Sequence, residues 1–219
     1  LVENALTLLW QQRQDHKLSG KTYQQQGGIA GMLSSQADAL LARIDQAVPQ
    51  GKLAALELLL RLTRINDEGR HTRQRVSLSD AIFAAGNGDE KAGRKVVDML
   101  SGQRDNATLQ TGRHDVLRLI TIGQEQDRHY ADLIHETLIR ARGKDPANGK
   151  LTGYWPALYD YIDNNRDRDH YRQLLAHESQ QWQQSKGLGR IWNLHWFGLR
   201  KFRALRIPGH SLEGRFLAW

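Results

Sequence analysis

The sequence predicts a mainly α-helical fold that contains one small β-hairpin. Apolar residues recur at helical spacing along most of the 219 residues, and this period is typical of amphipathic helices. One stretch near residues 116–134 instead combines two β-rich runs with a turn between them, which indicates a hairpin. The composition of 39% hydrophobic and 25% charged residues is that of an ordinary globular protein, so there is enough apolar surface for one large or two small domains.

Three amphipathic helices are expected at the start, over residues 1–14, 29–47 and 52–65. Turn residues separate them, with Gly27-Gly28 before the second helix and Pro49 after it. The apolar positions expected to face the core of the second helix are Ile29, Leu33, Ala37, Leu40, Leu41 and Ile44. Those of the third are Leu53, Leu56, Leu59, Leu60, Leu62 and Ile65.

The middle of the chain is expected to form a short edge strand over Arg73–Val76, followed by two helices. The first helix runs through Ala84, and Ser77 or Ser79 is placed to cap it. The second runs to about Leu100, with Asp89 as its cap. The side-chain oxygens of these residues can accept hydrogen bonds from the free amides of the first turn. The expected buried residues of that second helix are Ala92, Val96, Val97 and Leu100. A polar loop is expected over 101–114.

The hairpin is expected to run from Val116 to Ile122, turn over Gly123–Asp127 and return over Tyr130–Ile134. Three helices, a short strand and a terminal hairpin together make a winged helix, which is a helix-turn-helix unit with a β-hairpin wing. Beyond it, helix is expected from His135 to about Arg142, a loop over Gly143–Gly153, and further helices.

Those further helices cover Trp155–Asn164 and Asp169–Gln184. Their expected buried residues are Leu158, Tyr161, Ile162, Tyr171, Leu174, Leu175 and Trp182.

Composition excludes several classes of site. There is no cysteine, so disulfides and thiolate metal sites are excluded. The histidine spacings, such as that of His170 and His177, do not fit a zinc helix, and we predict no metal site and no catalytic residue. No apolar run spans a bilayer and no signal peptide is visible, so a cytoplasmic protein is expected. The apolar ends and the missing initiator Met lead us to expect a piece of a longer chain.

Several short motifs occur in order along the chain. They are Leu6–Trp10, Tyr23 with Gly27–Leu33 and Ala37–Ala39, Thr72–Val76, Leu133–Arg140 with Trp155–Leu158, and Arg172–Trp182. Together they resemble the region that follows the nucleotide-binding domain of bacterial STAND NTPases, the relatives of the NB-ARC ATPases. The likeness runs from residue 1 to about 185. It departs from the family at Gln36, where the family often has His, and at 141–154, which interrupts the fourth motif. The basic, aromatic tail 188–219 matches no family pattern.

The resemblance implies three parts. Residues 1–50 would be the end of a helical domain and a connecting helix, 51–142 a winged-helix domain, and 143–219 a C-terminal helical region leading to a sensor or repeat domain. It implies a regulatory segment that couples the ADP or ATP state to conformational switching and homo-oligomerisation, in signal transduction and, by analogy with bacterial relatives, in defence. The nucleotide and its hydrolysis would belong to an N-terminal nucleotide-binding domain. This chain has no P-loop motif, so we expect it to bind no cofactor alone and not to be an enzyme.

Within this resemblance, His135 and Glu136 are the candidate nucleotide-sensing residues. The family's histidine contacts the phosphates of ADP and holds the inactive state closed; a ring N–H can donate to a phosphate oxygen, and a partly charged imidazole gains more from the anion. The alternative is a strand-end histidine bonded to a backbone carbonyl. Glu136 would orient the start of a helix or be solvated, and Arg140 would pair across a domain interface or be exposed.

A second interpretation is a DNA-binding winged helix. Lys91, Arg94 and Lys95 lie on its second helix and Arg118 on its wing, where such a unit contacts DNA. Acidic residues are mixed with them, whereas phosphate binding prefers an unbroken basic stripe. A basic and aromatic segment, 188–206, has the composition of an interfacial helix or of a surface that packs on a neighbouring domain. Neither nucleic acid nor a membrane is the expected partner.

Overall fold

In this computed structural model, the structure describes residues 10, 20–25, 27–65, 70–103, 117–145, 149–184, 205, 207 and 211–218. The chain forms two compact units, Leu1–Ile162 and Asp163–Trp219, which are described separately. The fold is mainly helical with small antiparallel sheets, as predicted. The boundaries predicted at residues 50 and 142 stay a prediction.

The first unit begins with α2 (Gly20–Gln25), α3 (Gly28–Ala47) and α4 (Gly51–Arg61). The helix predicted over 29–47 is confirmed, but its buried face is turned slightly, since Met32 is buried and Ile29 is 37% exposed. The buried residues of α3 are Met32, Leu33, Ala37, Leu40, Leu41 and Ile44. Of the helix predicted over 1–14, only Trp10 lies within the described residues, and its side chain is exposed.

Helix α4 ends at Arg61, four residues before the predicted end, because the chain turns there into a small antiparallel pair. β1 (Thr63–Arg64) pairs with β2 (Thr72–Arg73). Gln74 donates hydrogen bonds to the free carbonyls at the end of α4. Its backbone N–H donates to the carbonyl of Leu62 at 2.9 Å, and its side-chain amide donates to the carbonyl of Arg61 at 2.8 Å. The predicted core face of this helix was partly wrong, since Leu53 is 52% exposed while Leu58, not predicted, is fully buried.

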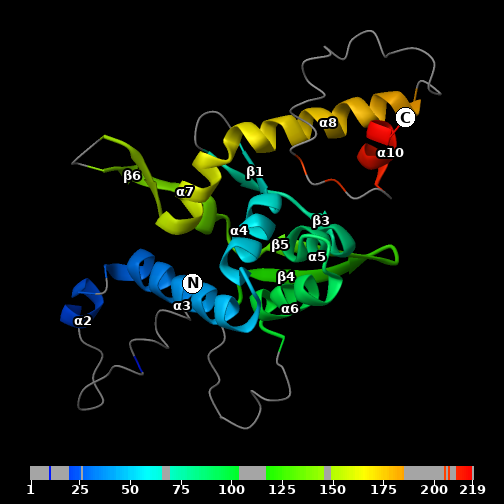
Figure 1. The fold of residues 1–219 in the computed structure, drawn as a ribbon. Coiled ribbons are helices and arrows are strands. Elements are labelled where there is room, and N and C mark those ends of the chain that lie inside the picture. Colours follow the sequence, from blue (N-terminus) through cyan, green and yellow to red (C-terminus); the bar gives the residue numbers. More distant parts are fainter. Residues whose placement is uncertain are drawn as a thin grey trace. The chain divides into compact units, whose positions relative to one another are not determined.

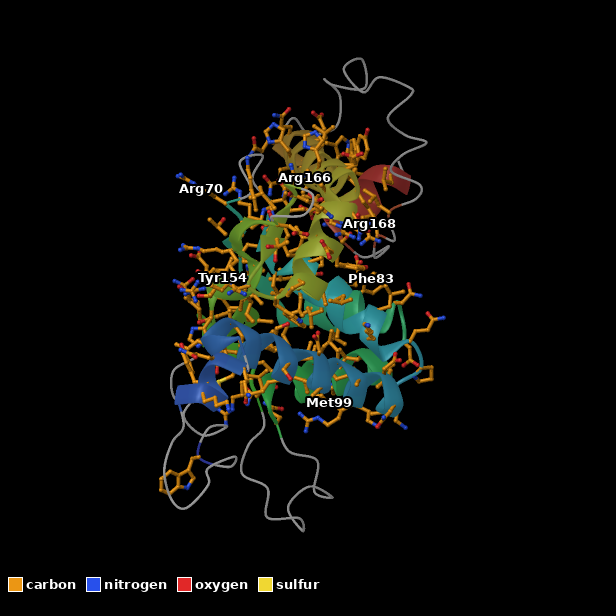
Figure 2. The ribbon with its side chains drawn as sticks, turned by 90° about the vertical axis from the view of Figure 1, so that its left-hand side faces the viewer. Arg70, Phe83, Met99, Tyr154, Arg166 and Arg168 are labelled. Atoms are coloured by element: carbon orange, nitrogen blue, oxygen red, sulfur yellow. The ribbon has the colours of Figure 1, made fainter. Side chains whose placement is uncertain are left out.

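Two capped helices follow β3 (Val76–Ser77): α5 (Leu78–Gly86) and α6 (Glu90–Ser101). Both capping predictions are confirmed, because the Ser77 side chain accepts from the Asp80 amide at 3.1 Å and the Asp89 carboxylate from the Ala92 amide at 3.0 Å. The two helices pack closely at Gly93, where a Cβ would overlap the carbonyl oxygen of Ile82. Figure 2 labels Phe83 on α5 and Met99 on α6.

A three-stranded antiparallel sheet packs against these helices, in the order β3–β5–β4. It contains the predicted hairpin, β4 (Ile120–Glu125) and β5 (Arg128–Leu133). The turn predicted over 123–127 was too long, because residues 123–125 stay paired with β5. Only Gln126 and Asp127 form the turn, with left-handed φ values of 45° and 63°, as a tight two-residue hairpin requires.

The predictions over 135–153 were wrong in two respects. Instead of an α-helix there is a short 3₁₀ turn, η2 (Glu136–Ile139). Instead of a loop there is a second hairpin, in which β6 (Ala141–Lys144) pairs with β7 (Leu151–Gly153) around an irregularity between Ala141 and Gly143. Pairing satisfies the backbone groups of this exposed segment, and the pairing is extended by the Tyr154 amide, which donates to the Arg140 carbonyl at 3.2 Å. Figure 2 labels Tyr154 beside this hairpin.

Helix α7 (Pro156–Asn164) follows, with the first unit ending at its Ile162, and the predicted helix over 155–164 is confirmed. One apolar core joins α3, α4, α5 and α6 with the inner face of β4 and β5. Figure 1 shows α4, α5 and α6 gathered around this sheet, and the β6–β7 hairpin extending away from them. The end of β5 and the start of η2 therefore lie between the apolar core and the β6–β7 hairpin.

The second unit contains α8 (Arg166–Gln184) and α10 (Leu212–Ala218). Helix α8 begins three residues earlier than predicted. Its Leu175 is buried against Leu205, whereas Leu174, predicted to be buried, is 41% exposed. Of the loop predicted over 101–114, residues 104–114 lie outside the described residues, and so do residues 188–204 of the tail 188–219. Among the helices described, none has the length and apolar content needed to cross a bilayer.

Candidate functional site

His135 lies where the three-stranded sheet ends and η2 begins. β5 ends at Leu133, and His135 follows in an extended conformation, with φ −135° and ψ 125°, as the residue that precedes the first turn of η2. Its side chain is half-buried and makes no capping hydrogen bond to that turn. The ring therefore does not serve as the cap of η2.

Burial lowers the pKa of His135 below its usual value of 6.5, and the positive charge of Arg73 lowers it further. The imidazole is consequently neutral near pH 7, with one ring nitrogen as donor and the other as acceptor. In this state His135 has one ring N–H that can donate to an anion.

Glu136 is paired within its own turn. Its carboxylate accepts from the Arg140 guanidinium at 2.6 Å, with side-chain exposures of 31% and 59%. Arg140, for which the sequence left an interface pair or an exposed side chain open, is thus exposed and joined to Glu136. The pair stiffens η2 directly after His135.

Two arginines that sequence reasoning did not select lie against the same strand. Arg73 donates from Nη1 to the carbonyl of Leu133 at 3.3 Å and lies 3.9 Å from the Asp132 carboxylate. Arg75 contacts Asp132 from Nε at 3.5 Å and Glu125 from Nη1 at 3.0 Å. Its guanidinium also lies 4.6 Å from the centre of the Tyr130 ring, within the range of a cation–π contact.

The motif Thr72–Val76 therefore has a two-sided structural role. Alternate residues of an extended chain point to opposite sides, so Arg73 and Arg75 meet β5 while Gln74 points back to α4. This alternation was visible in the sequence. Its partner Asp132 was not, because the contact joins β5 to residues almost sixty positions earlier.

Two of the sequence motifs also meet in the fold. The indole N–H of Trp155 donates to the Asp38 carboxylate on α3 at 2.8 Å, and Trp155 is fully buried. Asp38 belongs to the second motif and Trp155 to the fourth. The phenol of Tyr161 donates to Glu57 on α4 at 2.9 Å. These two contacts attach α7 to the helices at the start of the unit.

The residues of the DNA-binding interpretation are exposed but dispersed. Lys91, Arg94 and Lys95 lie on the outer face of α6, with Arg94 3.7 Å from Glu90 and Lys95 donating to the Ala47 carbonyl at 3.2 Å. Arg118 lies ahead of β4 and lines a shallow depression of about 280 Å³ at the end of α6. Three of these four basic side chains thus lie on α6 together with the acidic Glu90, and the fourth lies on another segment. They do not form an unbroken basic stripe.

No group of three or more histidine, aspartate or glutamate side chains that could hold a metal ion occurs in the described part of the chain.

The chain belongs to the STAND NTPase class. The model of one family in that class, described as novel STAND NTPase 1, matches residues 1–188, and the chain is a member of that family. Searches of the curated proteins and of the solved structures returned no match. The matched range includes His135, Glu136, Arg73 and the arginine contacts of β5.

Proposed function

We propose that this chain is the regulatory winged-helix segment of a STAND-type signalling NTPase. It would couple the ADP or ATP state of a neighbouring nucleotide-binding domain to conformational switching and oligomerisation. The observation that carries the proposal is the position of His135, half-buried between the end of β5 and the start of η2, in a chain of this family.

The order of elements supports the winged-helix part of the proposal. Helix α4 is followed by strand β3, by the helix pair α5 and α6, and by the β4–β5 hairpin, and the sheet order is β3–β5–β4. A helix-turn-helix unit with a hairpin wing has these parts. In this chain the hairpin ends at the candidate sensing residue, so a movement of the unit would move His135 with it.

In the mechanism we propose, the neutral imidazole of His135 donates its N–H to a phosphate oxygen of ADP. The phosphate and its binding domain lie outside this chain. Exchange of ADP for ATP would withdraw the winged helix from the nucleotide, and a ligand shifts such an equilibrium only by its difference in affinity for the two states. His135 would supply that difference for ADP.

The remaining expectations belong to the same proposal. Hydrolysis is assigned to the nucleotide-binding domain, because this chain carries no P-loop motif. A C-terminal sensor or repeat domain would release the inactive state, and further copies of the protein would assemble after release. We place this signalling protein in the bacterial cytoplasm, with defence as its role by analogy.

The test uses the full-length protein and measures its oligomeric state by sedimentation in ADP and in ATP. The wild type should stay monomeric in ADP and assemble in ATP. The variant His135→Ala should assemble in ADP as well, because the contact that favours the closed state is lost. His129→Ala is the matched control, since His129 is an exposed histidine of β5, the strand that ends shortly before His135. Equal behaviour of wild type and His135→Ala in both nucleotides would contradict the proposal.

The DNA-binding alternative has its own outcome. It predicts that the chain binds duplex DNA at low salt with a steep salt dependence, and that Lys91→Glu weakens the binding. Absence of binding at low salt would remove this alternative.

A further inference from the structure

Arg73 and His135 are distant in sequence but meet at the end of β5. Arg73 donates to the Leu133 carbonyl, two residues before His135, and β2 contacts η2. The charge of Arg73 also contributes to the lowered pKa of His135, after burial. A permanently charged side chain and a histidine therefore lie near the same end of β5.

The guanidinium of Arg73 keeps donors for a further partner. Both of its contacts, to the Leu133 carbonyl and to Asp132, use Nη1. Among the described residues its Nη2 and Nε have no hydrogen-bond or ion-pair partner, and the side chain is 49% exposed. Arginine presents its N–H groups as a planar fork that fits phosphate oxygens.

The neighbouring arginines are engaged differently. Arg75 uses Nε and Nη1 on Asp132 and Glu125 and stacks on Tyr130. Arg140 is held by Glu136 at 2.6 Å. Of these three arginines, Arg73 combines the loosest ion pair with the position beside His135.

Asp132 is the group that places Arg73. Its side chain is 8% exposed, and its Oδ2 atom faces both Arg73 and Arg75. Arg75 lies closer to the Asp132 carboxylate than Arg73 does, and Arg75 is itself held by Glu125. The Asp132 carboxylate is therefore anchored by Arg75 and in turn orients Arg73. We regard Asp132 as a positioning residue.

We propose that Arg73 is a second phosphate contact and that Arg73 and His135 together form a two-donor subsite for the phosphates of ADP. His135 supplies a ring N–H, and Arg73 supplies a permanent positive charge and a planar set of donors. This inference rests on the proposed function, because it assigns a further residue to the same nucleotide contact. A purely structural alternative is that Arg73 only fastens β2 to β5.

The experiment measures the dissociation constants of ADP and of adenosine for the full-length protein. Adenosine carries no phosphate, so it reports on the integrity of the nucleotide site without the proposed contact. Arg73→Gln should weaken ADP about tenfold, as expected for the loss of a charge-assisted hydrogen bond, and should change adenosine affinity by less than about twofold. Arg73→Lys keeps the charge but not the fork and should give an intermediate value.

Arg94→Gln is the matched control. Arg94 is an arginine of α6 with the same kind of exposure, 56%, and its ion pair is with Glu90, so its replacement should leave both affinities within about twofold of the wild type. A thermal melt of each variant accompanies the titrations. If Arg73→Gln does not fold, Arg73→Lys carries the test, and unchanged ADP affinity in that variant counts against the proposal.

The outcomes separate the two proposals. If His135→Ala weakens ADP and the Arg73 variants do not, this inference is wrong and the proposed function stands. If neither residue affects ADP, the proposed function fails as well. Equal losses for ADP and adenosine in the Arg73 variants would assign Arg73 a structural role and overturn the inference.

Discussion

The two faces of the three-stranded sheet differ sharply, although they alternate along the same strands. On β5, Ala131 and Leu133 point to the inner face and are fully buried in the core. Tyr130 and Asp132 point to the outer face, where Arg75 contacts both. One face is apolar, and the other carries charged side chains around a buried carboxylate.

This difference indicates where stability and function lie. Full burial of an aliphatic side chain contributes about 1.5–3 kcal/mol, whereas an exposed ion pair contributes about 0–1 kcal/mol. The arginines of the outer face are each about half exposed, so their pairs with Asp132 add little to folding. We infer that the outer face is arranged for orientation of Arg73 and of the end of β5, beside His135.

The largest effect is expected on the inner face. Leu133→Ala should lower the free energy of unfolding by about 2–5 kcal/mol, since it leaves a cavity in a fully buried position. Thr121→Ala, at an exposed outer-face position of β4, should change it by less than about 0.5 kcal/mol. Urea unfolding of both variants measures the difference, and similar losses in the two would remove the distinction between the faces.

A smaller effect is expected from the buried carboxylate of the outer face. Asp132→Asn should lower the free energy of unfolding by about 1 kcal/mol, because its pairs with two half-exposed guanidinium groups are screened by solvent. The same variant should lose ADP affinity in the full-length protein through misplacement of Arg73. Denaturant unfolding gives the first value and nucleotide titration the second. A variant more stable than the wild type would mean that desolvation of the carboxylate outweighs its ion pairs.

The edge of the sheet gives a further, local comparison. Ser77 ends β3 and caps α5, accepting from the Asp80 amide at 3.1 Å and donating to the Asp80 carboxylate at 2.6 Å. Ser77→Ala should lower the free energy of unfolding by about 1 kcal/mol. Asp89→Ala, which removes the cap of α6, should lower it by a similar amount. Calorimetric melting of both variants would show whether the strand-end cap differs from the loop cap.

The smallest effect is expected from pH. The folded-state pKa of His135 lies below its usual value of 6.5, chiefly because of burial and also because of Arg73. The unfolded chain therefore takes up the proton first, and this residue lowers stability as the pH falls through about 6.5. The charged groups around it are Arg73 and Asp132, with Glu136 and Arg140 on η2. His135→Gln should flatten the stability profile between pH 7 and 5.5, and an unchanged profile would show that His135 does not contribute.

Local signals in the sequence predicted much of this fold. Helices α3, α5 and α6 were predicted from the spacing of their apolar residues and from caps such as Ser77 and Asp89. These caps make contacts within one turn of the chain. The hairpin followed from its β-rich runs. The end of α4 and the β6–β7 hairpin were mispredicted, because the strands that form there are short and carry no β-rich apolar run.

The candidate site was predictable only in part. His135 came from the resemblance of its motif, and the alternation of Arg73 and Arg75 was visible in the sequence. Their contact with Asp132 was not, since nothing local indicates which of many carboxylates faces two arginines across the sheet. The lowered pKa of His135 was missed for the same reason, because it depends on burial and on a distant charge.

The rate of ADP release from the full-length protein tests the central claim most directly. A fluorescent ADP analogue is bound to wild type, His135→Ala and His129→Ala, and its displacement by excess unlabelled ADP is followed by stopped flow. The account predicts release about tenfold faster or more for His135→Ala, with His129→Ala like the wild type. Equal release rates for wild type and His135→Ala would contradict it, because the histidine would then not hold the nucleotide.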